Sequence, residues 1–195
     1  MSISLPICPC QINPVSDAIG APLLYQDCCQ PYHDGLLNNQ ADKIVGAKPD
    51  SAEPLMRSRY SAFVLIKSEY IVKTTLPAQQ ALLDIKAIEN WAKETVWAGL
   101  EIITHTPKLG KRHAQVEFKA YFNISDNTAD NTADSLEEKR QAHHELSAFV
   151  KVTDKANNDA RWYFLDPTVS MTVTQKQPCI CGSGEKFKRC CGMYI

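Results

Sequence analysis

The stretch that decides the fold class is Gln115-Val-Glu-Phe-Lys-Ala-Tyr-Phe122. Its apolar residues alternate with more polar neighbours, and this period of two is typical of a strand with one buried face. The same alternation starts after Trp97, at Leu100, Ile102 and Thr104. Further strand-like runs cover residues 146–152, 161–165 and 169–173. These patterns predict a largely antiparallel sheet of four or five strands joined by hairpins.

Two helices are expected ahead of this sheet. Asp50 or Ser51 can cap the first, which then carries an apolar face at helical spacing, formed by Met56, Tyr60, Phe63 and Val64. The second is expected from Leu82 to about Trp91, with one face formed by Ile85, Ile88 and Ala92. Helices first and sheet second predict an α+β fold.

Composition narrows the class of protein. The 195 residues are 44% hydrophobic and 22% charged, which is enough to bury one main core. A net charge of −1 argues against a protein coated with phosphate-binding residues, and we expect no sequence-specific DNA binding. The first residues lack a basic segment and are interrupted by Pro6, so we expect no secretory signal and a cytoplasmic location. No apolar run is long enough to predict a membrane span.

The eight cysteines form two quartets with the same pattern, Cys-x-Cys followed after a spacer by Cys-Cys. They are Cys8, Cys10, Cys28 and Cys29 near the start of the chain, and Cys179, Cys181, Cys190 and Cys191 near its end. Four thiolates are the ligand set of a closed tetrahedral zinc site, so the pattern predicts two structural Zn²⁺ ions. Disulfides are the alternative, but neighbouring cysteines bridge only through a strained ring and a reducing cytosol keeps thiols free. We expect the quartets to fold small appendages around an independent centre.

The two quartets differ in their surroundings. Three basic residues and Glu185 give the C-terminal segment a charge of +2, which balances the −2 of a zinc ion with four thiolates; the basic residues are Lys186, Lys188 and Arg189. Residues 8–35 contain three aspartates and no lysine or arginine. His33 is a further possible ligand there, although a capping or surface role is the favoured interpretation because four thiols are already present.

The run from Cys179 to Cys191, with Gly182-Ser-Gly184 in its middle, resembles the SEC-C motif, the zinc-binding tail of the translocation motor SecA. The resemblance implies the same four cysteines as ligands, and Glu185 is its visible departure from the motif. It also implies docking to a protein partner, as the SecA tail docks to SecB.

The whole chain resembles the bacterial YchJ-like proteins, on residues 55–63, 144–149 and 25–35. Two departures stand at the first motif: Gln11-Ile12 replaces Gly-Ser, and seventeen residues separate Cys10 from Cys28. The resemblance implies a central cone-shaped domain like nuclear transport factor 2 at residues 45–174. Zinc motifs at residues 1–36 and 177–195 are expected to flank it.

The repeat of Asn-Thr-Ala-Asp within residues 125–135 predicts a loop.

Such cones serve enzymes, ligand binders and interaction modules alike. Pocket candidates with acid, base or anion-binding chemistry are Arg57, Arg59, Tyr60, His144 and Glu145. The two arginines point to different faces of a helix, so at most one faces a pocket, and adjacent residues on a regular strand cannot form a compact His144–Glu145 pair. No familiar catalytic signature is present, so an enzyme is the less favoured interpretation.

Two functions remain from sequence. The first is a zinc-dependent adaptor that presents Lys186, Lys188 and Arg189 to a protein or ribosome. The alternative is a small-molecule binder or enzyme that uses the interior of the cone.

Overall fold

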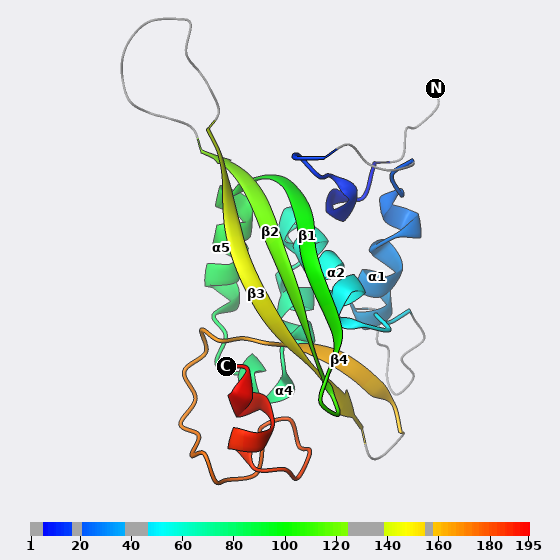
Figure 1. Cartoon of the computed structure of the whole chain (residues 1–195). Helices are drawn as coiled ribbons and strands as arrows, with labels where there is room; N and C mark the ends of the chain where they lie inside the picture. Colours follow the sequence, from blue (N-terminus) through cyan, green and yellow to red (C-terminus); the bar gives the residue numbers. More distant parts are fainter. Residues whose placement is uncertain (1–5, 17–20, 38–46, 125–138, 155–157) are drawn as a thin grey trace, which may run out of the picture.

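The computed structural model describes residues 6–16, 21–37, 47–124, 139–154 and 158–195. Within these residues, five α-helices precede a four-stranded sheet, which confirms the α+β class (Figure 1). The helices are α1 Gln30–Leu37, α2 Ala52–Val64, α3 Ser68–Thr74, α4 Pro77–Gln80 and α5 Ile85–Glu94. The strands are β1 Val96–Leu109, β2 His113–Ile124, β3 Lys139–Thr153 and β4 Ala160–Leu165. The repeat within 125–135 lies outside the described residues.

The sheet has the order β1-β2-β3-β4, and every neighbouring pair is antiparallel. Long, twisted strands curve around the helices, with α2 and α5 covering the concave side (Figure 1). In β2 the predicted alternation puts Val116, Phe118 and Ala120 inside, where none is more than 5% exposed. The strand pattern thus fixes which face of the sheet meets the helices.

The prediction of a fifth strand at residues 169–173 is wrong, because the structure has no strand there. After β4 the chain turns at Asp166, whose carboxylate accepts hydrogen bonds from the Thr168 amide and hydroxyl at 2.8 and 2.6 Å. The free edge of β4 is instead met by the segment before α4. Thr75 bridges Phe164, and the Leu76 amide donates to the Phe164 carbonyl at 2.9 Å. The edge is therefore paired by a loop where a fifth strand was expected.

Both predicted helices form, with shifted limits. Helix α5 begins at Ile85 because Asp84 accepts hydrogen bonds from the amides of Lys86 and Ala87, both at 3.0 Å. Ile85 is 43% exposed, so its assignment to the buried face is wrong, whereas Ala92 is buried. Helices α1, α3 and α4 were not predicted from sequence. Ile66, which has a φ of 55°, separates α2 from α3.

The cysteine segments pack against the central core, although small appendages around an independent centre were expected. Cys8, Cys10 and Cys29 pack in one cluster with apolar residues of α2 and the sheet. The C-terminal cysteines pack in a second cluster with Leu76, Val150 and others. Within the described residues, no helix is both long and apolar enough to cross a membrane.

Gly99 lets the N-terminal segment approach β1. Its φ is +139°, and the Leu100 amide beside it donates to the Ile12 carbonyl at 2.8 Å. A Cβ on Gly99 would lie 2.7 Å from the Ile12 oxygen, closer than any side chain tolerates. Glycine is therefore required at the point where the N-terminal segment meets the sheet.

Candidate metal centres and ligand cavity

The N-terminal quartet converges on one point. The Cys10 sulfur lies 3.5 Å from the sulfurs of Cys8, Cys28 and Cys29, and the Cys28 and Cys29 sulfurs are 3.9 Å apart. Ligands held about 2.3 Å from a tetrahedral zinc ion lie about 3.8 Å from one another. A disulfide needs a separation of about 2 Å. All four cysteines are free, so their geometry fits a zinc site.

The C-terminal quartet has the same geometry. The Cys181 sulfur lies 3.6 Å from that of Cys179 and 3.5 Å from that of Cys190, and all four sulfurs lie within 4.8 Å of one another. The four side chains are buried. Gly182 and Gly184 both have positive φ, which forms the tight turn between the two cysteine pairs. The predicted set of eight thiols thus forms two clusters of four cysteines each.

Hydrogen bonds among the sulfurs separate the pKa values within each cluster. They raise the pKa of Cys29 and of Cys191, and they lower that of at least one partner in each cluster. The hydrogen bond with Cys10 is the largest cause that lowers the pKa of Cys8. The hydrogen bond with Cys191 is the largest cause that lowers the pKa of Cys181 to about 4. Each cluster therefore contains at least one thiolate at neutral pH, before any ion adds its own charge.

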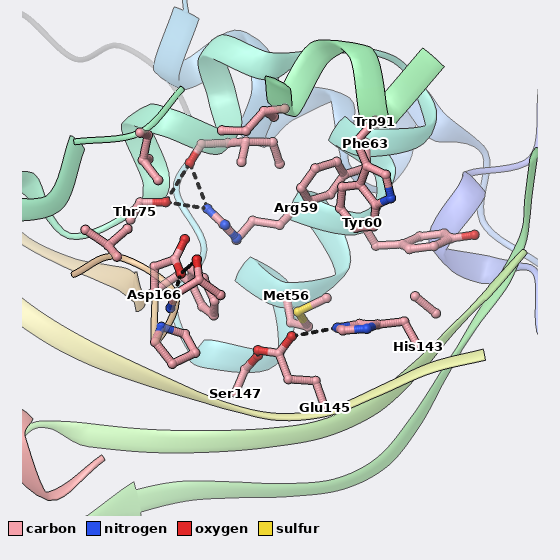
Figure 2. A pocket seen from close by; sticks show the side chains of 18 of the residues that line it. Met56, Arg59, Tyr60, Phe63, Thr75, Trp91, His143, Glu145, Ser147 and Asp166 are labelled. Carbon is pink, nitrogen blue, oxygen red and sulfur yellow. Dashed lines mark hydrogen bonds and ion pairs between the residues drawn. The ribbon is translucent and has the colours of Figure 1, made fainter. Parts of the chain in front are cut away.

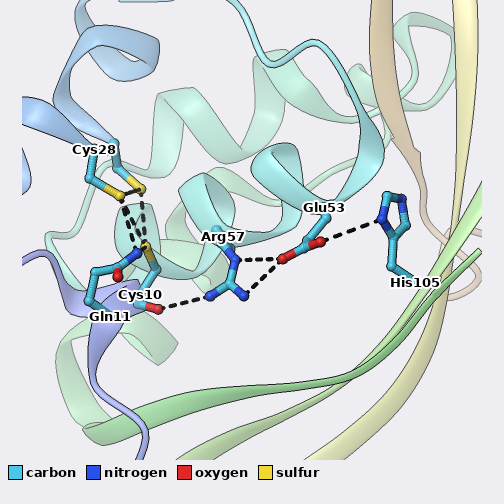
Figure 3. Close-up of polar contacts among 7 residues, drawn as sticks. Cys10, Gln11, Cys28, Glu53, Arg57 and His105 are labelled. Atoms are coloured by element: carbon cyan, nitrogen blue, oxygen red, sulfur yellow. Dashed lines mark hydrogen bonds and ion pairs between the residues drawn. The ribbon is translucent and has the colours of Figure 1, made fainter. Parts of the chain in front are cut away.

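Helix α2 supplies the cation that residues 8–35 lack. The Arg57 guanidinium donates to the Cys10 carbonyl at 3.2 Å and pairs with Glu53 at 2.8 Å (Figure 3). Glu53 in turn faces the His105 ring at 3.4 Å. The amide of Gln11 donates to the sulfurs of Cys10 and Cys28, both at 3.6 Å. Such contacts orient the ligands of a metal site.

His33 is neither a metal ligand nor a surface residue. Its side chain is fully buried, Nε2 donates to the Ser58 carbonyl at 2.9 Å, and Nδ1 accepts from the Tyr25 hydroxyl at 2.8 Å. The carbonyl can only accept, so Nε2 carries a proton, and in the neutral ring Nδ1 is then the acceptor. Burial lowers the pKa of His33. The expectation of a capping or surface role is therefore wrong, because both ring nitrogens are used inside the core.

His113, the first residue of β2, joins the C-terminal cluster to the sheet. Its Nε2 lies 3.5 Å from the Cys191 sulfur and 3.8 Å from that of Cys190, and its ring lies 4.5 Å from that of Tyr194. The sequence does not predict this contact, because 78 residues separate the partners and no local pattern marks it. An imidazole N–H directed at a thiolate is a typical way to steady a zinc ligand.

The basic residues of the C-terminal zinc knuckle, the segment from Cys179 to Cys191, are on the surface. Lys186, Lys188 and Arg189 are exposed, whereas Glu185 pairs with Lys111 at 3.6 Å. Phe187 lies beneath them, 8% exposed, among the apolar residues around the cluster. The C-terminal zinc knuckle therefore carries three exposed cations on its outer surface, and its inner surface is buried against the core.

A cavity of about 690 Å³ lies between the helices and the concave face of the sheet. Its apolar lining comes from α2, α5, β1, β2 and β4, and includes Tyr60, Phe63, Trp91, Trp97, Phe118 and Phe164. Buried residues such as Arg59 and Ser147 form its floor, and exposed ones such as Leu82 and Trp91 form its mouth. Its size and lining are those of a small-molecule site.

Arg59 is the buried cation of this cavity. It is 5% exposed, and its Nη1 donates to the Ile71 carbonyl at 2.8 Å and to the hydroxyls of Thr74 and Thr75 at 2.7 and 3.2 Å (Figure 2). The guanidinium carbon lies 4.4 Å above the Phe164 ring. Burial lowers the pKa of Arg59 to about 10, so the group stays charged at neutral pH.

Strand β3 forms the opposite wall. His143 Nε2 lies 2.9 Å from a Glu145 oxygen, and Ser147 donates to the other oxygen at 2.5 Å (Figure 2). Residues two apart on a strand share a face, and this signal in the sequence would have found His143 and Ser147.

Three of the five predicted pocket residues line the cavity: Arg59, Tyr60 and Glu145. The other two require correction. Arg57 points away from the cavity toward Cys10, and His144 faces the opposite side of the sheet, where Nε2 lies 2.9 Å from Glu117. On a strand, His144 points to the face opposite that of its neighbour Glu145, which lines the cavity. On a helix, Arg57 points to a different face from Arg59, two residues further along.

The fold and its clusters define a class of protein in which two four-cysteine knuckles pack onto a cone of helices and curved sheet. Residues 51–167 match the family described as "YchJ, middle NTF2-like domain". Residues 1–37 match "YchJ family protein, N-terminal zinc binding domain", and residues 176–192 match "SEC-C motif". The chain belongs to the YchJ family, and this confirms the resemblance and the cone-shaped fold predicted from sequence.

Relatives match along nearly the whole chain. A UPF0225 protein of Actinobacillus succinogenes is 42% identical over 97% of this chain and 98% of its own length. A UPF0225 protein of Haemophilus influenzae is 44% identical over 100% and 96%. The crystal structure of a SEC-C motif containing protein from Psychrobacter arcticus is 72% identical, covers 100% of this chain and 98% of that chain, and has a TM-score of 0.83.

Proposed function

We propose that the protein binds a small molecule in the cavity between α2, α5 and the sheet, and that the two zinc knuckles hold the walls of that cavity. The observation that carries the proposal is a largely apolar cavity of about 690 Å³ with a charged guanidinium at its floor. Packed interiors rarely leave so large a space, because empty volume costs dispersion contacts. This ranks ligand binding above the adaptor role that the sequence favoured.

A neutral dye tests the cavity without any assumption about charge. N-phenyl-1-naphthylamine becomes fluorescent in apolar surroundings, and we expect saturable binding at one site per chain. Ala87→Trp should abolish the signal, because Ala87 is an exposed residue of α5 that lines the cavity. Ala78→Trp is the matched control, since Ala78 is exposed on α4 and does not line it. Equal binding by both variants would contradict the proposal.

A second candidate, docking to an acidic protein or ribosome, is supported by the exposed cations Lys186, Lys188 and Arg189 on the C-terminal knuckle. Less entropy is lost when a rigid turn docks. Co-sedimentation with ribosomes and pull-down should then fall with salt and fall in Lys186→Glu, Lys188→Glu. The control Lys86→Glu, Lys93→Glu makes the same charge change on α5. Retention by the knuckle variant would rule out this surface.

The cytoplasm remains the proposed compartment. All eight cysteines are free, and a reducing environment keeps such thiols available for zinc.

A further inference from the structure

The hydrogen bonds of Arg59 indicate the ligand class of the cavity. Every hydrogen bond that its side chain makes to described residues starts at Nη1. The donors on Nε and Nη2 have no acceptor among those residues. Among the described residues, the polar side-chain atoms that are both fully buried and without a partner are His105 Nε2 and Arg161 Nη2. The two free donors of Arg59 are therefore not fully buried. Since Arg59 lines the cavity, these donors open onto it.

Among the described residues, the charge of Arg59 also has no close counterion. No carboxylate of a described residue lies within 4.0 Å of it, although Glu145 and Asp166 line the same cavity. Both acids have donors of their own: His143 and Ser147 for Glu145, and Thr168 for Asp166. A buried cation is normally paired, because desolvation without a partner is costly. An anion from the ligand would complete Arg59.

The neighbouring acids limit how much negative charge fits. Glu145 and Asp166 both contribute a field that already favours the charged form of Arg59. A dianionic phosphate would meet the repulsion of both carboxylates with a single guanidinium to offset it. A monoanionic carboxylate matches the planar fork of one arginine through two hydrogen bonds.

We infer that the cavity takes an aromatic or other apolar monocarboxylate, with its carboxylate on Nε and Nη2 of Arg59 and its apolar body extending along Phe118 and Phe63 toward Trp91 at the mouth. The inference rests on the proposed function, because it names the ligand class of that same cavity. The orientation of the ligand follows the exposure of the lining residues, which rises from 5% at Arg59 to 47% at Trp91.

Three probes of one shape separate the charge requirement from binding as such. These are 2-naphthamide, 2-naphthoate and 2-naphthyl phosphate, compared by titration calorimetry on the full chain with zinc bound. We expect 2-naphthoate to bind about tenfold to hundredfold more tightly than the amide, the range that a charge-assisted hydrogen bond supplies. The phosphate should bind more weakly than the carboxylate.

Two variants assign the preference to Arg59. Arg59→Gln should bring 2-naphthoate down to the affinity of the amide, whereas Arg57→Gln, on the same helix but outside the cavity, should keep the preference. If Arg59→Gln does not fold, Glu145→Gln provides the second measurement: it removes a nearby negative charge, so the carboxylate should bind more tightly and the amide unchanged.

The outcomes distinguish the two claims. Equal affinity for the amide and the carboxylate in the parent protein would overturn the ligand class and leave the proposed function standing. Tighter binding of the phosphate would also overturn it. Failure of all three probes to bind would overturn the proposed function, and the ligand class with it.

Discussion

Replacement of Gly99 by alanine should loosen the N-terminal zinc knuckle, the segment that carries Cys8 and Cys10, from the sheet. The residue has a φ of +139°, which side chains rarely adopt, and a Cβ there would lie 2.7 Å from both the Ile12 oxygen and Pro14 Cδ. The knuckle must therefore move away from β1, which stretches the 2.8 Å hydrogen bond from the Leu100 amide to the Ile12 carbonyl.

The size of the effect follows from these two contributions. Backbone strain in such a region costs about 1–3 kcal/mol for a residue with a side chain. Loss of one backbone hydrogen bond costs about 0.5–1.5 kcal/mol. Together they predict that Gly99→Ala lowers the free energy of unfolding by about 1.5–4.5 kcal/mol.

Gly110→Ala is the matched control. Gly110 has a φ of +60°, but no atom lies within 4 Å of its Cβ position, so the left-handed conformation alone should cost about 1–2 kcal/mol. Urea unfolding followed by circular dichroism compares the two. Release of zinc to a chromogenic chelator should be faster in Gly99→Ala and unchanged in Gly110→Ala. Equal stability and equal release in both variants would refute the claim that this contact holds the knuckle.

Three further predictions concern metal, cooperativity and pH. The protein should carry about two zinc ions per chain, and Cys10→Ser or Cys181→Ser about one, by elemental analysis. Because Cys181 packs with Val150 and Leu165, Cys181→Ser should lower the main thermal transition seen by circular dichroism; an unchanged transition would restore the appendage view. Burial lowers the pKa of His33, so stability is full above the unfolded pKa of about 6.5 and falls as pH drops below it. Urea midpoints between about pH 5.5 and 7.5 should therefore slope less in His33→Gln, and equal slopes would exclude this histidine.

The zinc clusters were predictable because their information is local. A Cys-x-Cys pair and a Cys-Cys pair recur at both ends of the chain, and the sulfurs of each quartet lie within 4.8 Å. What surrounds them was not predictable in the same way. The contacts of His113 with Cys191 and of Arg57 with Cys10 join residues 78 and 47 positions apart, so they exist only once the sheet and α2 are packed.

The residues that line the cavity could be predicted only in part, because the helical period left one choice open and β3 is longer than its sequence pattern. The helical period separated Arg57 from Arg59, but it could not say which of them faces inward. On β3 the predicted strand began at Leu146, whereas the strand begins at Lys139. The longer strand puts His143 on the face of Glu145. Tertiary pairing with β2 extends it, at Ala120 opposite His143.

Helix α2 explains why the zinc knuckle and the cavity occur together. On one side Ser61 lies 3.5 Å from the Cys8 sulfur and Arg57 binds the Cys10 carbonyl; on the other side Arg59 and Tyr60 line the cavity. A helix that borders an empty space loses the dispersion contacts that would otherwise hold it. The knuckle supplies contacts on its opposite face, and a bound ion adds stability that needs no additional apolar core. Zinc can thus keep α2 in place while the space beside it stays open for a ligand.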